Sequence, residues 1–189
     1  MQVSRSELIL GGQKSGKSRR AELLARDWLA QSPSHHALLI ATAQPWDDEM
    51  RERIARHQRD RAERVAQLAT LEAPRAVAQA IAAHSSPQHL LIVDCLTLWL
   101  TNWLMPAPDL PAQQDAADTW PAQAAQFLQA LQQAPGPVIL VSNEIGLGVI
   151  PLGREVRAFV DALGTLNQQT AAVCNRVTFM AAGLPLQMK

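Results

Sequence analysis

The chain has 189 residues, of which 48% are hydrophobic and 18% charged, and its 17 basic and 17 acidic residues give a formal net charge of zero. This length and composition suit one α/β core, so we expect a single domain over residues 1–189. A balanced charge provides no global attraction for nucleic acid. No run approaches the ~20 apolar residues of a membrane span, and the N-terminus lacks a signal-peptide pattern. We therefore expect a cytoplasmic protein without a membrane span or a nucleic-acid partner.

The first element is a phosphate-binding P-loop. An apolar run at residues 8–10 precedes the spacing G-x-x-x-x-G-K-S, and a helix-forming segment follows. The glycines permit backbone angles at which successive N–H groups surround a phosphate, and the helix that begins there adds its positive dipole end. Lys17 would contact the β and γ phosphates, and the Ser18 hydroxyl would bind Mg²⁺. The predicted nucleotide-binding residues are Gly11, Gly12, Gln13, Lys14, Ser15, Gly16, Lys17 and Ser18.

The next segments are a helix over residues 16–31, a parallel strand over 37–43 and a charged helix over 47–61. Two side-chain stripes run along the charged helix and meet at His57. One stripe comprises Met50, Ile54, His57 and Arg61, and the other comprises Glu49, Arg53 and His57. From this pattern alone His57 is either an ordinary surface or half-buried side chain or a nucleophile near the nucleotide.

An edge strand within residues 65–72 and a helix over 74–83 lead to a strong apolar strand over 89–97. Asp94 follows four apolar residues of that strand, in the manner of a Walker B acid. Its carboxylate would hold Mg²⁺ directly or through water, or else it is a structural cap. Cys95 and Cys174 have no metal-ligand spacing around them, so we expect two buried free thiols.

The remaining pattern is a helix over 98–105, a proline-rich loop over 106–121, a helix over 122–134, a strand over 138–142, a helix over 154–174 and a last strand over 176–182. Polar residues and glycines at 143–151 follow a strand, where open α/β sheets bind ligands. This alternation predicts an α/β fold with a mostly parallel sheet flanked by helices.

Four stretches together resemble one family along nearly the whole chain. They are residues 11–18, residues 48–57 with His57, residues 93–102 and residues 141–151, joined by Arg157, Phe159, Asp161, Gly164, Asn167 and Gln168. The chain resembles the bifunctional adenosylcobinamide kinase / adenosylcobinamide-phosphate guanylyltransferases of cobalamin biosynthesis. Lys14 stands where that family often has arginine.

The resemblance implies a P-loop NTPase fold and a homotrimer. It implies an Mg²⁺-dependent enzyme that phosphorylates adenosylcobinamide with ATP or GTP, then transfers GMP from GTP to adenosylcobinamide phosphate to give adenosyl-GDP-cobinamide. The transfer would pass through a guanylylated histidine, and His57 matches that position. Lys17 would act in catalysis. Glu144 would be either a base for the substrate hydroxyl or an acid at the trimer interface.

Two other functions are compatible with parts of this sequence. A plain small-molecule kinase would use the P-loop and leave His57 as a surface residue. A GTP-dependent switch or binding module would need a guanine motif, yet no Asn-Lys-x-Asp occurs, and the formal match at 161–164 lies inside a late predicted helix rather than after a strand.

Overall fold

The computed structural model describes residues 3–106 and 119–189. Its sheet has seven strands in the order β3-β2-β4-β5-β1-β6-β7. All neighbours pair in parallel except β6 and β7, which are antiparallel. The strands are β1 (Ser6–Gly11), β2 (His36–Ala41), β3 (Ala69–Glu72), β4 (His89–Asp94), β5 (Val138–Val141), β6 (Arg176–Ala181) and β7 (Leu184–Gln187). The parallel strands thus bring their carboxyl ends to one edge of the sheet.

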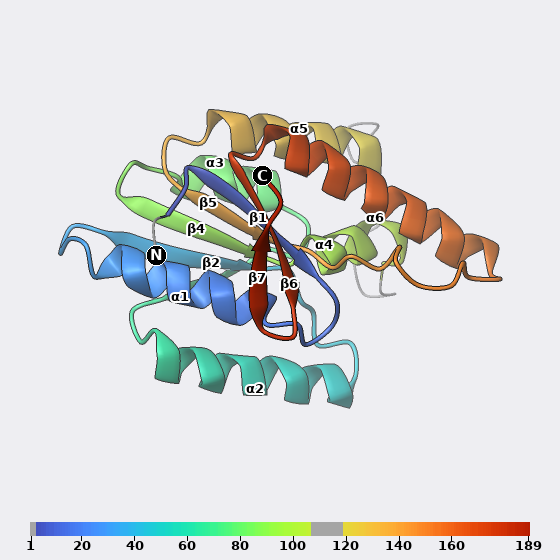
Figure 1. Ribbon diagram of the computed structural model, residues 1–189, viewed down its shortest axis with the longest axis horizontal. Coiled ribbons are helices and arrows are strands. Elements are labelled where there is room, and N and C mark those ends of the chain that lie inside the picture. Colours follow the sequence, from blue (N-terminus) through green and yellow to red (C-terminus); the bar gives the residue numbers. More distant parts are fainter. Residues whose placement is uncertain (1–2, 107–118) are drawn as a thin grey trace.

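Helices cover both faces of this sheet (Figure 1). They are α1 (Lys17–Leu29), α2 (Asp48–Arg64), α3 (Val77–His84), α4 (Leu96–Leu104), α5 (Trp120–Gln133) and α6 (Arg154–Val173). Figure 1 shows α1 on one face with α2 outside it, and α3 and α5 on the other. Within the described residues, no helix is both long and apolar enough to cross a membrane.

Alternating strand residues supply two separate cores, one on each face of the sheet. Leu8, Ile40 and Val93 pack with residues of α3 to α6. Ile9, Leu39 and Ile92 pack with residues of α1. Successive side chains of a strand point to opposite faces, so a strand covered on both faces is continuously apolar. This explains why β1, β2, β4 and β5 could be predicted from short apolar runs.

The predicted α/β class and mostly parallel sheet are confirmed, with three corrections to the elements. The strand predicted over residues 176–182 is present as β6, but it is not the last strand. Ala182 and Gly183 adopt positive φ values of 51° and 80° and turn the chain into β7. Helix α4 begins at Leu96 instead of residue 98, and α5 already includes Trp120 and Pro121. Most of the predicted loop at 106–121 lies outside the described residues.

Candidate functional site

The P-loop joins the carboxyl end of β1 to the first turn of α1. Its backbone takes positive φ at Gly11 (150°), Lys14 (55°) and Gly16 (99°). A Cβ at Gly11 would lie 2.4 Å from the Met180 carbonyl oxygen, so a larger residue would displace β6. The Gly183 N–H donates to the Ser15 carbonyl at 3.0 Å and fixes the loop from the other side. The positive φ values at Gly11, Lys14 and Gly16 are compatible with a loop whose N–H groups converge on a phosphate.

Lys17 is the buried cation of this loop. The residue is 7% exposed, and its Nζ donates to the Gly12 carbonyl at 2.6 Å. Burial lowers the pKa of Lys17, and Arg53 lowers it further, whereas Cys95 and Asp94 oppose the shift. Among the residues that the structure describes, no carboxylate forms an ion pair with this ammonium. Lys17 is thus a desolvated positive charge that an incoming phosphate can satisfy.

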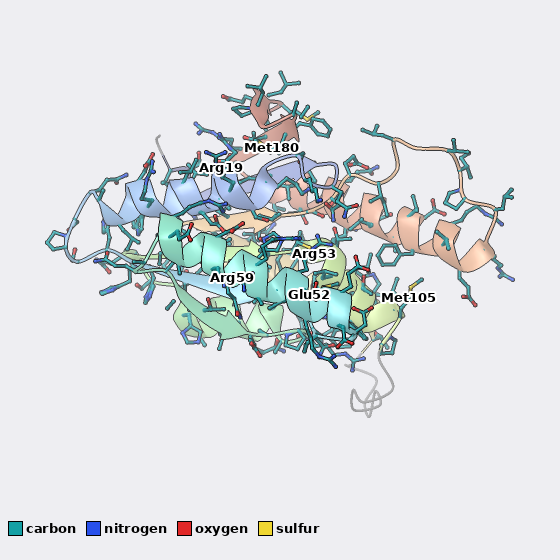
Figure 2. The ribbon with its side chains drawn as sticks, turned by 90° about the horizontal axis from the view of Figure 1, so that it is seen from below. Arg19, Glu52, Arg53, Arg59, Met105 and Met180 are labelled. Carbon is teal, nitrogen blue, oxygen red and sulfur yellow. The ribbon has the colours of Figure 1, made fainter. Side chains whose placement is uncertain are left out.

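A cleft of about 690 Å³, the phosphate cleft, lies between the P-loop and α2. Figure 2, seen from below, shows Arg53 on the side of α2 that faces α1, with Arg59 on the opposite side. The cleft is lined by Gln13, Lys14, Ser15, Gly16, Lys17, Ser18, Arg19, Glu49, Glu52, Arg53, Arg56, His57, Asp60, Arg64, Asp94, Cys95, Val141 and Asn143. The described part of the chain offers no carboxylate partner to Arg53 or Arg56. These cations suit a polyphosphate.

A second cavity of about 360 Å³, the side cavity, lies on the other side of His57. It is mainly apolar, with polar groups from β3 and α2. Its lining comprises Ser18, Leu39, Ala41, Ala43, Pro45, Met50, Arg51, Arg53, Ile54, Ala55, His57, Gln58, Arg61, Thr70, Glu72, Asp94, Cys95 and Leu98. The Met50–Arg61 stripe of α2 faces this cavity and the Glu49–Arg53 stripe faces the phosphate cleft. His57, at which the two stripes meet, therefore belongs to both walls.

Asp94 ends β4 beside the P-loop and also lines both cavities, together with Ser18. Thr42 holds the next residue in place: its Oγ1 donates to the Cys95 carbonyl and accepts from the Cys95 N–H, both at 2.8 Å. The Asp94 carboxylate and the Ser18 hydroxyl are a suitable pair of protein ligands for Mg²⁺, because this ion usually fills its remaining coordination positions with waters and phosphate oxygens. The described residues contain no cluster of three or more His, Cys, Asp or Glu that could hold a metal without a nucleotide.

Glu144 lies apart from this arrangement. Its Oε1 accepts a hydrogen bond from the Gly146 N–H at 3.3 Å, and it is not among the residues that line the phosphate cleft or the side cavity. Its neighbour Asn143 lines the cleft instead, held by the Thr97 Oγ1, which accepts from the Asn143 N–H at 2.9 Å. Asn143 was expected at this edge only as one of the polar residues of 143–151 that follow a strand, and no role was predicted for Arg56 or Arg64. The available signal for the two arginines was helical spacing, since Arg56 lies three residues after Arg53 and Arg64 lies seven residues after His57.

Comparison with known proteins gives consistent matches along the chain. The family model described as cobinamide kinase / cobinamide phosphate guanyltransferase matches residues 7–188. The chain is similar to the bifunctional adenosylcobalamin biosynthesis protein CobP of Pseudomonas aeruginosa, with 48% identity over 97% of this chain and 96% of that protein. It is also similar to the bifunctional adenosylcobalamin biosynthesis protein CobU of Escherichia coli K12, with 36% identity over 96% of this chain and 98% of that protein.

Among solved structures, the flagellar accessory protein FlaH from Methanocaldococcus jannaschii matches with a TM-score of 0.52 and 11% identity. The match covers 100% of this chain and 80% of the FlaH chain. At this identity the likeness concerns the fold alone.

Proposed function

Because the chain belongs to the cobinamide kinase / cobinamide phosphate guanyltransferase family, we propose that it phosphorylates adenosylcobinamide with ATP or GTP and then transfers GMP from GTP to adenosylcobinamide phosphate. The observation that carries the proposal is the position of His57 on the wall shared by the phosphate cleft and the side cavity. If the pyrophosphate of GTP lies in the phosphate cleft and the nucleoside lies in the side cavity, the α-phosphorus between them is within reach of His57.

In the kinase step, the substrate hydroxyl oxygen bonds to the γ-phosphorus and its proton passes to a base or to water, while the bond from that phosphorus to the β–γ bridging oxygen breaks. The P-loop N–H groups and Lys17 hold the phosphates in line for this displacement. Ser18 and Asp94 would hold Mg²⁺, which neutralises charge on the phosphate oxygens when it is bound. Glu144 accepts a hydrogen bond from its own turn and would have to turn toward the cleft to act as a base for the hydroxyl.

In the transfer step, a neutral His57 ring nitrogen attacks the α-phosphorus of GTP. A phosphorus–nitrogen bond forms, and the bond to the pyrophosphate oxygen breaks. A phosphate oxygen of adenosylcobinamide phosphate then attacks the same phosphorus and releases His57. Lys17, Arg53 and Arg56 stabilise the leaving pyrophosphate in the phosphate cleft. The side cavity has room for a nucleoside, so we assign the base and ribose to it.

A pair of radiolabels tests the two steps separately. With GTP labelled at the γ-phosphate, wild type and His57→Asn should both label adenosylcobinamide. With GTP labelled at the α-phosphate, only wild type should label adenosylcobinamide phosphate. His84→Asn, an exposed histidine at the end of α3, is the matched control and should behave as wild type. Transfer of the γ-label alone by wild type would favour a plain kinase, and α-label transfer by His57→Asn would refute the role of His57.

We further propose that the protein is a homotrimer, as its family resemblance implies. Apolar side chains are exposed on the segment before α6 and include Val149 (96% exposed) and Leu152 (98% exposed). Such a surface is better covered than left in water. Light scattering with size-exclusion chromatography should give about three times the 20.6 kDa chain mass. The proposed substrates ATP and GTP are nucleotides of the cytoplasm, so we propose that the protein acts in that compartment.

A further inference from the structure

Helix α2 carries His57 but contributes no buried residue to either core. The apolar side chains of Met50 and Ile54 line the side cavity and belong to neither core. Most helical stability in proteins comes from the packing of an apolar face, and α2 has little of it. The direction of α2, and with it the position of His57, must therefore depend on a few specific contacts.

The C-terminal end of α2 has such a contact. Arg64 Nη1 donates to Glu22 Oε2 of α1 at 2.6 Å, and the Glu22 side chain is only 5% exposed. Over residues 3–106 and 119–189 this is the single ion pair between α2 and another element. A further side-chain hydrogen bond from α2, from Arg61 to Thr70 Oγ1 of β3, is exposed and 3.3 Å long. Val65, the next residue after Arg64, is buried in the core beneath α1.

We propose that the Arg64–Glu22 ion pair is a positioning device that fixes the direction of α2 and so holds His57 across the phosphate cleft from the P-loop. The proposal rests on the proposed function, because the role of His57 is itself proposed. Glu22 lies one helical turn after Ser18 on α1. The pair therefore ties the helix that carries the nucleophile to the helix that carries the phosphate-binding residues.

The geometry indicates how much this pair matters. His57 precedes Arg64 by seven residues, which is about 10 Å along a helix. A tilt of about 10° around the anchored end would therefore move His57 by about 2 Å. Since a misplacement of about 1 Å at a reacting centre can cost about 100-fold in rate, a small tilt should be visible in the transfer step.

Arg64 differs from the other cations of the phosphate cleft. Its guanidinium already donates to two carboxylates, Glu22 at 2.6 Å and Asp60 at 3.4 Å. Arg53 and Arg56 have no such partner in the described part of the chain. We therefore assign phosphate binding to Arg53 and Arg56, and a structural influence on His57 to Arg64.

The first test compares Arg64→Met with Arg59→Met, an exposed arginine on the opposite side of α2. The single-turnover rate at which GTP labelled at the α-phosphate modifies His57 should fall about 10- to 100-fold in Arg64→Met. At saturating GTP the kinase rate should stay within about 3-fold of wild type, because the P-loop, Lys17, Ser18 and Asp94 are not part of α2. The Kd for GTP should rise, because Arg53 and Arg56 move with α2, so the labelling rate is also compared at saturating GTP. Arg59→Met should match wild type in all three measurements.

A second variant separates positioning from folding. Arg64→Met leaves the Glu22 carboxyl buried without its partner, which destabilises the fold in itself. Glu22→Gln with Arg64→Met removes that charge, so its unfolding temperature should return toward wild type while His57 labelling stays slow. Recovery of labelling in the double variant, or normal labelling in Arg64→Met, would overturn the positioning role alone. Absence of label in wild type would overturn the proposed function together with it.

Discussion

Replacement of Lys17 by Met should stabilise the nucleotide-free protein while abolishing nucleotide binding. Lys17 is a buried cation without a carboxylate partner in the described part of the chain, and burial lowers its pKa. Between its folded pKa and its ordinary value of 10.5, the unfolded chain binds more protons than the folded one. The charged lysine therefore weakens the folded state at neutral pH, and that penalty is relieved as the pH rises toward 10.5.

The size of the effect follows from two opposing contributions. Met loses the charged hydrogen bond from Nζ to the Gly12 carbonyl, worth about 1.5–3 kcal/mol. It also removes the desolvation penalty of a buried ammonium, which amounts to several kcal/mol. Gly12 is exposed, so water can satisfy its carbonyl. We expect a net gain of about 1 kcal/mol, which raises the unfolding temperature by about 2–4 °C for a chain of this size.

Thermal unfolding with and without Mg²⁺ and GTP measures both parts of this prediction. GTP at 100 times its Kd should stabilise wild type by about 2.7 kcal/mol, or about 5–11 °C. Lys17→Met should unfold above wild type without nucleotide and show almost no shift with GTP. A variant that unfolds several degrees below wild type would show that Lys17 is a structural residue, and a retained GTP shift would show that it does not bind phosphate.

Three further predictions concern stability. Gly11→Ala would place a Cβ 2.4 Å from the Met180 carbonyl oxygen. It should lower the free energy of unfolding by about 2–3 kcal/mol and the unfolding temperature by at least about 4 °C. An unchanged unfolding temperature would refute the packing argument. Asn102→Ala removes hydrogen bonds from Nδ2 to the Thr42 and Pro74 carbonyls, both 2.8 Å long. The free energy of unfolding measured in urea should fall by about 2–4 kcal/mol, and a fall below about 1 kcal/mol would contradict the importance of these bonds. Burial raises the pKa of Cys95 and of Cys174 from 9.0 to about 11. The free energy of unfolding should therefore fall between pH 9 and 11, by up to about 3 kcal/mol for each thiol. Cys95→Ala with Cys174→Ala should flatten that pH dependence, and an unchanged slope would contradict the prediction.

Much of the fold could be predicted because the sheet is covered on both faces. The buried strands β1, β2, β4 and β5 are short continuous apolar runs between polar breaks, a pattern that needs no tertiary information. Strand β7 could not be recognised in this way, since its four residues are all exposed and include Pro185. Its turn is formed by Ala182 and Gly183, which lack the usual Asn-Gly signal of a tight hairpin.

The site shows the same division between local and tertiary information. Helical spacing predicted the two stripes of α2 that meet at His57, because side-chain periodicity is a local property. The spacing did not show that each stripe would line a cavity, since that depends on how α2 lies over α1 and the sheet. Arg64 lies beyond the predicted end of the helix at residue 61, and its partner Glu22 is 42 residues away, so no local pattern connects them.

The most direct test of the account is covalent modification of His57. Wild type incubated with Mg²⁺ and GTP labelled at the α-phosphate, then denatured, should retain label that is labile in acid and stable in base, as expected of a phosphoramidate. His57→Ala should retain none. Label confined to wild type would support guanylyl transfer through His57. An active, GTP-binding wild-type protein without covalent label would contradict that mechanism.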